Sequence, residues 1–290
     1  MRKEILAGLS TFFTVAYLIL LYPKILAEGG IDFGSALTAT ILTIVFSTTF
    51  LALYAHFPAV LAPGLSIGPY LVYSVILQQH ATWQTVFGIV FWAGLVLLLL
   101  SLFKVRQQIL LHMPSSIKSA AIAGIGLFLI CIGLKDLSLF RGEILTIPNG
   151  IVLFGLLLFF ALYYFQISSA FLLSIVACWA LAFPFGLAAW KGVAALPASL
   201  TPTFLQLDFW TPLHPQMWGT LLSVILINLF DTSASLSILA KLAHKLDEEG
   251  RIKNLDRIVI PDGVGNIFAS FLSLPLSRRI STCATQFLEK

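Results

Sequence analysis

Apolar residues occur along this chain in nine runs, separated by shorter segments that hold most of its charged residues. A helix needs about 20 mostly apolar residues to cross a bilayer, because lipid offers no partner to an unpaired backbone group. We therefore predict membrane helices at about residues 7–26, 36–56, 64–79, 83–103, 115–134, 146–164, 168–189, 216–241 and 259–274. No segment alternates apolar and polar residues as the strands of an outer-membrane barrel do. The pattern predicts an all-α polytopic protein that crosses the membrane eight or nine times.

The composition agrees with this pattern. Hydrophobic residues make up 59% of the 290 positions and charged residues 10%, whereas soluble domains have about 25% charged residues. The mean hydropathy of +0.97 extends over the whole chain and is not confined to one N-terminal stretch. This excludes a secreted soluble protein with a signal peptide.

The Lys and Arg residues between the spans predict the orientation. With a cytoplasmic N-terminus, ten of them lie on the inner side and four on the outer side. The inner residues are Arg2, Lys3, Lys104, Arg106, Lys118, Lys241, Lys245, Arg251, Lys253 and Arg257, and the outer ones are Lys24, Lys135, Arg141 and Lys191. This asymmetry follows the positive-inside rule and predicts a cytoplasmic N-terminus in a plasma or inner membrane. It also explains the net charge of +4 without nucleic-acid binding.

The third span begins with a segment that is poorly suited to a helix, Ala62-Pro63-Gly64-Leu65-Ser66-Ile67-Gly68-Pro69-Tyr70. Proline removes an amide donor and clashes with the preceding helical turn, so we expect this segment to start as extended chain. Non-helical backbone at membrane depth is tolerated where it is buried in protein or lines a cavity. Ser66, Gly68 and Tyr70 are therefore candidate ligand contacts, and an interfacial re-entrant loop without a ligand is the alternative.

A carboxylate lies inside the apolar span from Met217 to Leu239, at Asp231. A charge near the middle of a membrane helix costs a few kcal/mol, so Asp231 is expected to face the protein interior. Asn228, Thr232 and Ser235 share its helical face, because they lie three or four residues apart along the helix. This polar face could bind a polar solute, line a proton route, or hold two helices together.

The first span carries hydroxyl and aromatic side chains between Ser10 and Tyr17, among which Phe12 is a candidate stacking wall. Close helix packing is the favoured alternative for this group. Cys131, Cys178 and Cys283 are too scattered for a disulfide framework or a metal site, and we expect them to be packing residues. We predict neither a cofactor nor a metal.

Four groups of residues, taken together, resemble a known family. They are Thr11-Phe12 with Ala16-Tyr17, Ala62-Pro63-Gly64, Met113-Pro114-Ser115-Ser116-Ile117-Lys118 leading into Gly124-Ile125-Gly126-Leu127-Phe128 and Ile132-Gly133-Leu134, and Phe230-Asp231-Thr232 with Leu236. In order and separation they are similar to the adenine/guanine/hypoxanthine permeases of the nucleobase/cation symporter superfamily, which includes xanthine and uracil permeases. The resemblance extends over about residues 4 to 272.

The resemblance implies fourteen membrane segments in two inverted repeats of seven. Residues 1–190 would form the first repeat, and residues 191–290 would form segments eight, nine and the start of ten. Substrate would lie between two half-helices and the eighth segment. Asp231 matches the eighth-segment carboxylate that binds the base, and the stretch from Ser66 to Tyr70 matches the extended part of the third segment.

The chain departs from the family pattern at several positions. Gly68 stands where the family usually has Asn, and Ala234-Ser235 stand in place of Gly-Thr. Thr282 occupies the place of a tenth-segment Glu, with Arg278 and Arg279 nearby. The changes at Gly68 and at Ala234-Ser235 bear on the expected substrate choice. At position 282, the second substrate-binding carboxylate of the family is replaced by Thr.

We predict a membrane permease for purine nucleobases, coupled to H⁺ or Na⁺ and acting as a homodimer or with a complementing second chain. Because the sequence ends at Lys290, one alternative is a truncated or split transporter fragment without activity alone. A second is an anion carrier of related fold, in which half-helix N-termini hold the anion; Asp231 would oppose it. An intramembrane enzyme is least favoured, because no catalytic set falls at membrane depth.

Overall fold

The computed structural model describes residues 2–57, 59–136, 146–167, 170–187, 197–242, 255–272 and 278–279. These residues are mainly helical, as predicted. The long elements are α1 (Arg2–Glu28), α2 (Phe33–Ala55), η1 (Tyr70–Gln78), α4 (Trp83–Leu102), α5 (Val105–His112), α6 (Ser115–Asp136), α7 (Ile147–Tyr164), α8 (Ala170–Ala182), α9 (Trp218–Leu242) and α10 (Leu255–Phe271). The short ones are β1 (Ala62–Pro63), α3 (Ile67–Pro69), η3 (Thr211–Leu213), η4 (Pro215–Met217) and β2 (Arg278–Arg279).

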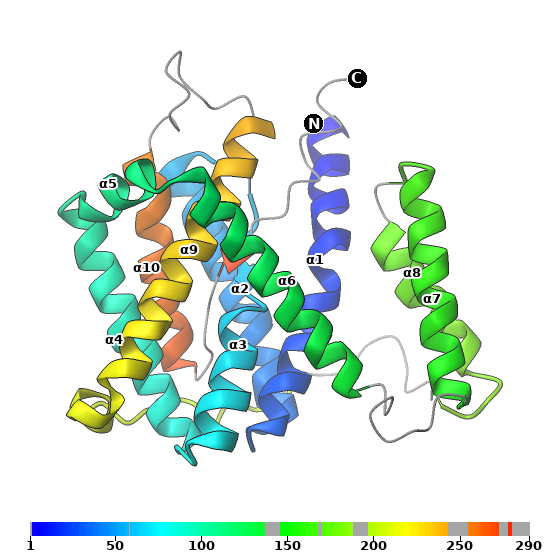
Figure 1. Cartoon of the computed structure of the whole chain (residues 1–290), viewed down its shortest axis with the longest axis horizontal. Coiled ribbons are helices and arrows are strands. Elements are labelled where there is room, and N and C mark those ends of the chain that lie inside the picture. The colour runs from blue at the N-terminus through cyan, green and yellow to red at the C-terminus, as the bar shows by residue number, and fades with distance from the viewer. Residues whose placement is uncertain are drawn as a thin grey trace.

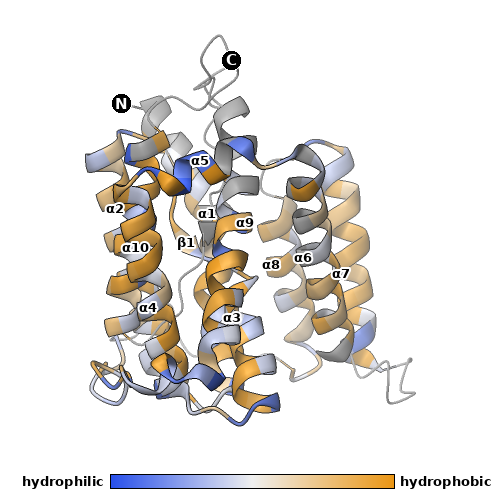
Figure 2. Cartoon of the chain, turned by 60° about the vertical axis from the view of Figure 1, so that its left-hand side comes forward, coloured by the Kyte–Doolittle hydropathy of each residue, from blue (hydrophilic) through white to orange (hydrophobic). Residues whose placement is uncertain are grey.

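Each of the nine predicted segments contains a helix, and the third contains α3 together with the π-helical turns of η1. Among the described residues, α2, α4 and α7 are long and apolar enough to cross a membrane by length and composition. Residues Ile67–Gln78 and α8 are apolar but shorter. Hydrophobic residues run along the helices, while hydrophilic ones gather mainly at the two ends of the molecule (Figure 2). The number of membrane crossings stays a prediction.

The helices form a main bundle with a smaller helical pair beside it (Figure 1). Helix α10 packs most extensively against α4 and α2, and α9 packs against α4. Helices α7 and α8 pack on each other at one end of the molecule, and α8 also contacts α1. Helix α6 runs obliquely in front of the bundle and contacts α9.

Glycine allows α10 to approach α4 closely. A Cβ atom on Gly263 would lie 2.9 Å from the Cα atom of Leu98, and one on Gly94 would lie 2.9 Å from the Cβ atom of Asn266. Small residues let membrane helices pack with their backbones nearly in contact, where dispersion forces are strongest. This packing places Asp262, the residue before Gly263, in the bundle interior, where it has no exposed surface.

One sequence-based prediction is wrong. Arg106 was assigned to a loop on the inner side, but it lies in α5 and its exposed surface is 0%. Lys104 adopts a left-handed conformation at φ 59° between α4 and α5, and this turn brings the chain back onto the bundle. The guanidinium of Arg106 therefore lies in the protein interior, where it forms an ion pair with the carboxylate of Asp262.

The α4–α10 contact predicts that Gly263→Ala destabilises the fold. The added methyl group would meet the backbone of Leu98, which cannot rotate away as a side chain can, and overpacking of this kind costs about 1–3 kcal/mol. The measurement is thermal unfolding of the purified protein followed by circular dichroism. Gly150→Ala in α7 is the control, because a Cβ there meets nothing within 4 Å; equal melting temperatures for the two variants would contradict the prediction.

Candidate functional site

The third segment starts with extended chain at Ala62–Pro63, as predicted, but the extended part is shorter than expected: residues 65–66 form a turn, and the stretch from Ile67 to Tyr70 is helical. Ala62 and Pro63 form strand β1, which pairs antiparallel with β2 so that Ala62 lies opposite Arg279 and Pro63 opposite Arg278. All residues from 61 to 69 are buried, and the helix begins at Ile67. The backbone of β1 thus has a strand partner inside the protein, which an extended segment in an apolar environment requires.

A hydrogen bond joins this break to α9. The hydroxyl of Ser66 donates to Oδ2 of Asp231 over 2.9 Å. Both side chains are buried, with exposed fractions of 6% for Ser66 and 9% for Asp231. The structure therefore brings together two candidate residues that lie 165 positions apart in the sequence.

The other candidates on α9 lie on the face that the spacing predicts. Asn228 and Thr232 are buried, and Ser235 is half-buried one turn further along. Tyr70, at the start of η1, is also half-buried. Phe12 lies on α1 with 49% of its side chain exposed.

Arg106 forms the centre of a second buried polar cluster, which we call the Arg106 cluster. It consists of Arg106, Ser101, Asn228, Thr232 and Asp262. The Nη2 atom forms a short ion pair with Oδ2 of Asp262 and donates to Oγ1 of Thr232 at 3.0 Å and Oδ1 of Asn228 at 3.4 Å.

The Nη1 atom of Arg106 completes this cluster on its other side. It donates to the carbonyl of Val259 at 3.2 Å and to the hydroxyl of Ser101 at 3.5 Å. One guanidinium thus connects α4, α5, α9 and α10. Removing one member of a fully buried ion pair costs about 3–5 kcal/mol, because the other charge is left uncompensated.

The sequence contained a signal for this cluster that the positive-inside count did not use. Asp262 lies within an apolar run, and a carboxylate in such a run needs a positive partner, by the same argument that selects Asp231. Arg106 follows a predicted span by three residues. The pairing itself joins residues 156 positions apart, and no local pattern encodes it.

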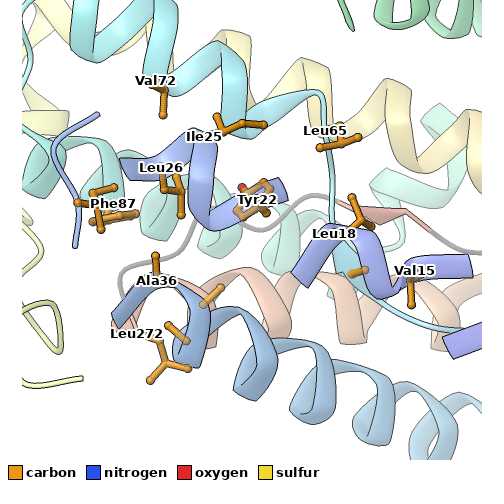
Figure 3. Packing of buried hydrophobic residues seen from close by; sticks show 14 of the residues in the cluster. Val15, Leu18, Tyr22, Ile25, Leu26, Ala36, Leu65, Val72, Phe87 and Leu272 are labelled. Atoms are coloured by element: carbon orange, nitrogen blue, oxygen red, sulfur yellow. The ribbon is translucent and has the colours of Figure 1, made fainter. Parts of the chain in front are cut away.

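Gly68 lies directly against the ring of Tyr22. A Cβ atom at position 68 would be 2.6 Å from Cε2 of Tyr22 and 3.0 Å from its hydroxyl oxygen. Tyr22 has no exposed surface and sits in a cluster with Leu18, Leu26 and Leu65 (Figure 3). The ring therefore occupies the space that a side chain at position 68 would need. This close packing explains why position 68 is a glycine.

The remaining residues that the sequence analysis singled out lie outside these two polar contacts. The backbone of Arg278 and Arg279 forms β2, whereas Thr282 and Cys283 lie outside the described residues. Cys178 packs across the α7–α8 contact, where its Sγ occupies the space that a Cβ atom at Gly155 would need. Cys131 is exposed, contrary to its expected packing role. Within the described part of the chain, His, Cys, Asp and Glu form no group of three or more that could hold a metal ion.

Polar groups buried at a break in one apolar helix are typical of membrane transport proteins. The family comparison agrees with this class. Residues 2–277 match the Permease family. The chain belongs to this family, and it is a multi-pass membrane protein and not an enzyme.

Curated relatives from bacteria show which permeases the chain is similar to. It is 31% identical to the guanine/hypoxanthine permease PbuO of Bacillus subtilis, over 93% of this chain and 66% of the relative. It is 29% identical to the adenine permease AdeP of Escherichia coli, over 93% of this chain and 63% of the relative. The chain thus spans just under two thirds of the length of these relatives.

The contact between Gly68 and Tyr22 predicts coupled stability effects. Gly68→Ala should lower the free energy of unfolding by about 1–3 kcal/mol, because its methyl group overlaps a fully buried ring. Combining it with Tyr22→Leu should make the Gly68→Ala change less costly than it is in the native background. A double-mutant cycle on melting temperature measures the coupling, and strictly additive effects would show that the two residues do not compete for space.

Proposed function

We propose that this protein is a permease for purine nucleobases of the guanine, hypoxanthine or adenine type. The observation that carries the proposal is the buried hydrogen bond between Ser66, at the break in the third segment, and Asp231 on α9. The relatives named as adenine and guanine/hypoxanthine permeases support the same substrate class.

The chemistry of these two residues suits a nucleobase. Purine bases carry ring and exocyclic N–H donors, and a carboxylate accepts such donors in short, directional, charge-assisted bonds. A carboxylate can accept about four hydrogen bonds, so the bond from Ser66 does not exhaust Asp231. Gly68, Tyr70, Ser235 and Phe12 stay proposed contacts around the base.

The complete transport unit and its coupling are part of the proposal. Residues 1–190 form the first of two inverted seven-segment repeats, and residues 191–290 belong to the second. Protonation of Asp231 would couple base and proton entry, with Na⁺ as the alternative coupling ion. The transport unit is a homodimer or includes a complementing second chain.

The binding test compares two carboxylates on different helices. Asp231→Asn should abolish equilibrium binding of radiolabelled guanine, hypoxanthine and adenine to the purified chain in lipid nanodiscs, because a neutral amide replaces the acceptor charge. Glu28→Gln on α1 is the matched control, since Glu28 accepts a hydrogen bond from Tyr73 near the surface. We expect this control to bind as the native protein does.

Two results would remove the proposed mechanism. One is nucleobase binding that does not change in Asp231→Asn. The other is binding of sulfate or bicarbonate in place of any base, which would favour the anion-carrier interpretation.

The proposed orientation places the N-terminus in the cytoplasm. A reporter enzyme that is active only in the cytoplasm should therefore be active when it is fused before Met1. A periplasmic reporter at the same position should be inactive. The reverse pattern would show that the count of Lys and Arg residues does not set the topology of this chain.

A further inference from the structure

Arg106 is a fully buried cation that the proposed binding chemistry does not use. Its side chain has no exposed surface, and burying a guanidinium is costly unless it is paired and hydrogen-bonded. The other members of the Arg106 cluster offset this cost with one carboxylate, an amide oxygen and two hydroxyls, and the carbonyl of Val259 adds a fifth acceptor, while the buried Nε atom of Arg106 has no hydrogen-bond partner among the described residues.

The cluster shares a helix with the proposed binding carboxylate. Thr232, which accepts from Nη2 of Arg106 at 3.0 Å, directly follows Asp231 in α9. Asn228 lies one turn earlier and accepts from the same atom at 3.4 Å. The hydroxyl of Thr232 also lies 3.3 Å from Oδ1 of Asn228 and 3.4 Å from Oδ2 of Asp262. These bonds from α5 and α10 constrain the rotation of α9 about its axis, in addition to the packing of α9 against α4 and α6.

This rotation determines whether Asp231 reaches Ser66. Side-chain atoms lie about 5–6 Å from a helix axis, so a rotation of about 10° moves a carboxylate by roughly 1 Å. The Ser66–Asp231 distance is 2.9 Å, and a further 1 Å would exceed the range of a hydrogen bond. A rotation of this size that carries Asp231 directly away from Ser66 is therefore sufficient to break the contact.

We propose that Arg106 is a positioning residue for the nucleobase site: its guanidinium fixes Thr232 and Asn228 against Asp262, and so aims Asp231 at Ser66. This inference rests on the proposed function. It also gives Asn228 and Thr232 an indirect role in place of direct contact with the base. A planar guanidinium donates in several fixed directions at once, which the point charge of a lysine cannot reproduce.

Three variants separate positioning from simple support of the fold. Arg106→Lys keeps the positive charge and loses the planar set of N–H donors. Arg106→Met combined with Asp262→Leu removes both charges, so that neither is left unpaired. Thr232→Val keeps the ion pair and removes the hydroxyl through which it holds α9. Each is purified in nanodiscs as the full chain, and its melting temperature and its Kd for guanine, hypoxanthine and adenine are measured.

We expect folded proteins whose Kd for the preferred base rises at least tenfold for both Arg106 variants and severalfold for Thr232→Val. Asp231→Asn and Glu28→Gln are the reference variants for lost and retained binding. If the folded variants bind within twofold of the native protein while Asp231→Asn does not bind, Arg106 supports the fold alone and the proposal is wrong. If only one Arg106 variant folds, that variant decides.

A second readout needs no substrate and therefore separates this proposal from the proposed function. Ser66→Cys and Asp231→Cys are combined in a chain whose native cysteines are serine. A short bis-methanethiosulfonate reagent links the pair, because each cysteine thiol forms a disulfide with the reagent and displaces methanesulfinate. The cross-linking rate should fall several-fold when Arg106→Lys is added. An unchanged rate would overturn the positioning role even if no nucleobase bound the native chain.

Discussion

A charge inside an apolar helical bundle must be compensated by other groups of the same chain, because lipid cannot hydrate it. In this protein the carboxylate of Asp262 and the guanidinium of Arg106 meet this requirement for each other, and both have no exposed surface. Their pairing joins α5 to α10, and the hydrogen bonds from Arg106 to Asn228 and Thr232 join α9 to the same guanidinium. Because α10 carries Gly263 against the backbone of Leu98, the ion pair and the closest helix packing reinforce the same arrangement.

The backbone groups at the break in the third segment must likewise find their partners inside the protein. An extended stretch inside the protein has N–H and C=O groups that a helix would have satisfied internally. Strand β2 supplies a partner for β1, and the ring of Tyr22 fills the space beside Gly68. Tyr22 thus occupies the volume that a larger side chain at position 68 would require.

The sequence predicted the helices well because their signal is local. The nine apolar runs contain helices, Pro63 lies in the extended start of the third segment, and Asn228, Asp231 and Thr232 lie on one buried face, as their spacing predicts. The partners were not predictable in the same way. Arg106 has a sequence context that suits a loop, and its burial depends on the turn at Lys104 and on a carboxylate far along the chain.

The two buried polar contacts share a property that bears on how the site forms. Ser66 and Asp231 are 165 residues apart, and Arg106 and Asp262 are 156 apart. Contacts of such long range form only after the intervening helices have come together, because closing the chain costs entropy before the contact compensates for it. The site is therefore a product of the packed bundle and not of any single helix. A substitution that loosens α10 from α4 is expected to act on Asp231 through Arg106, although it contacts neither residue.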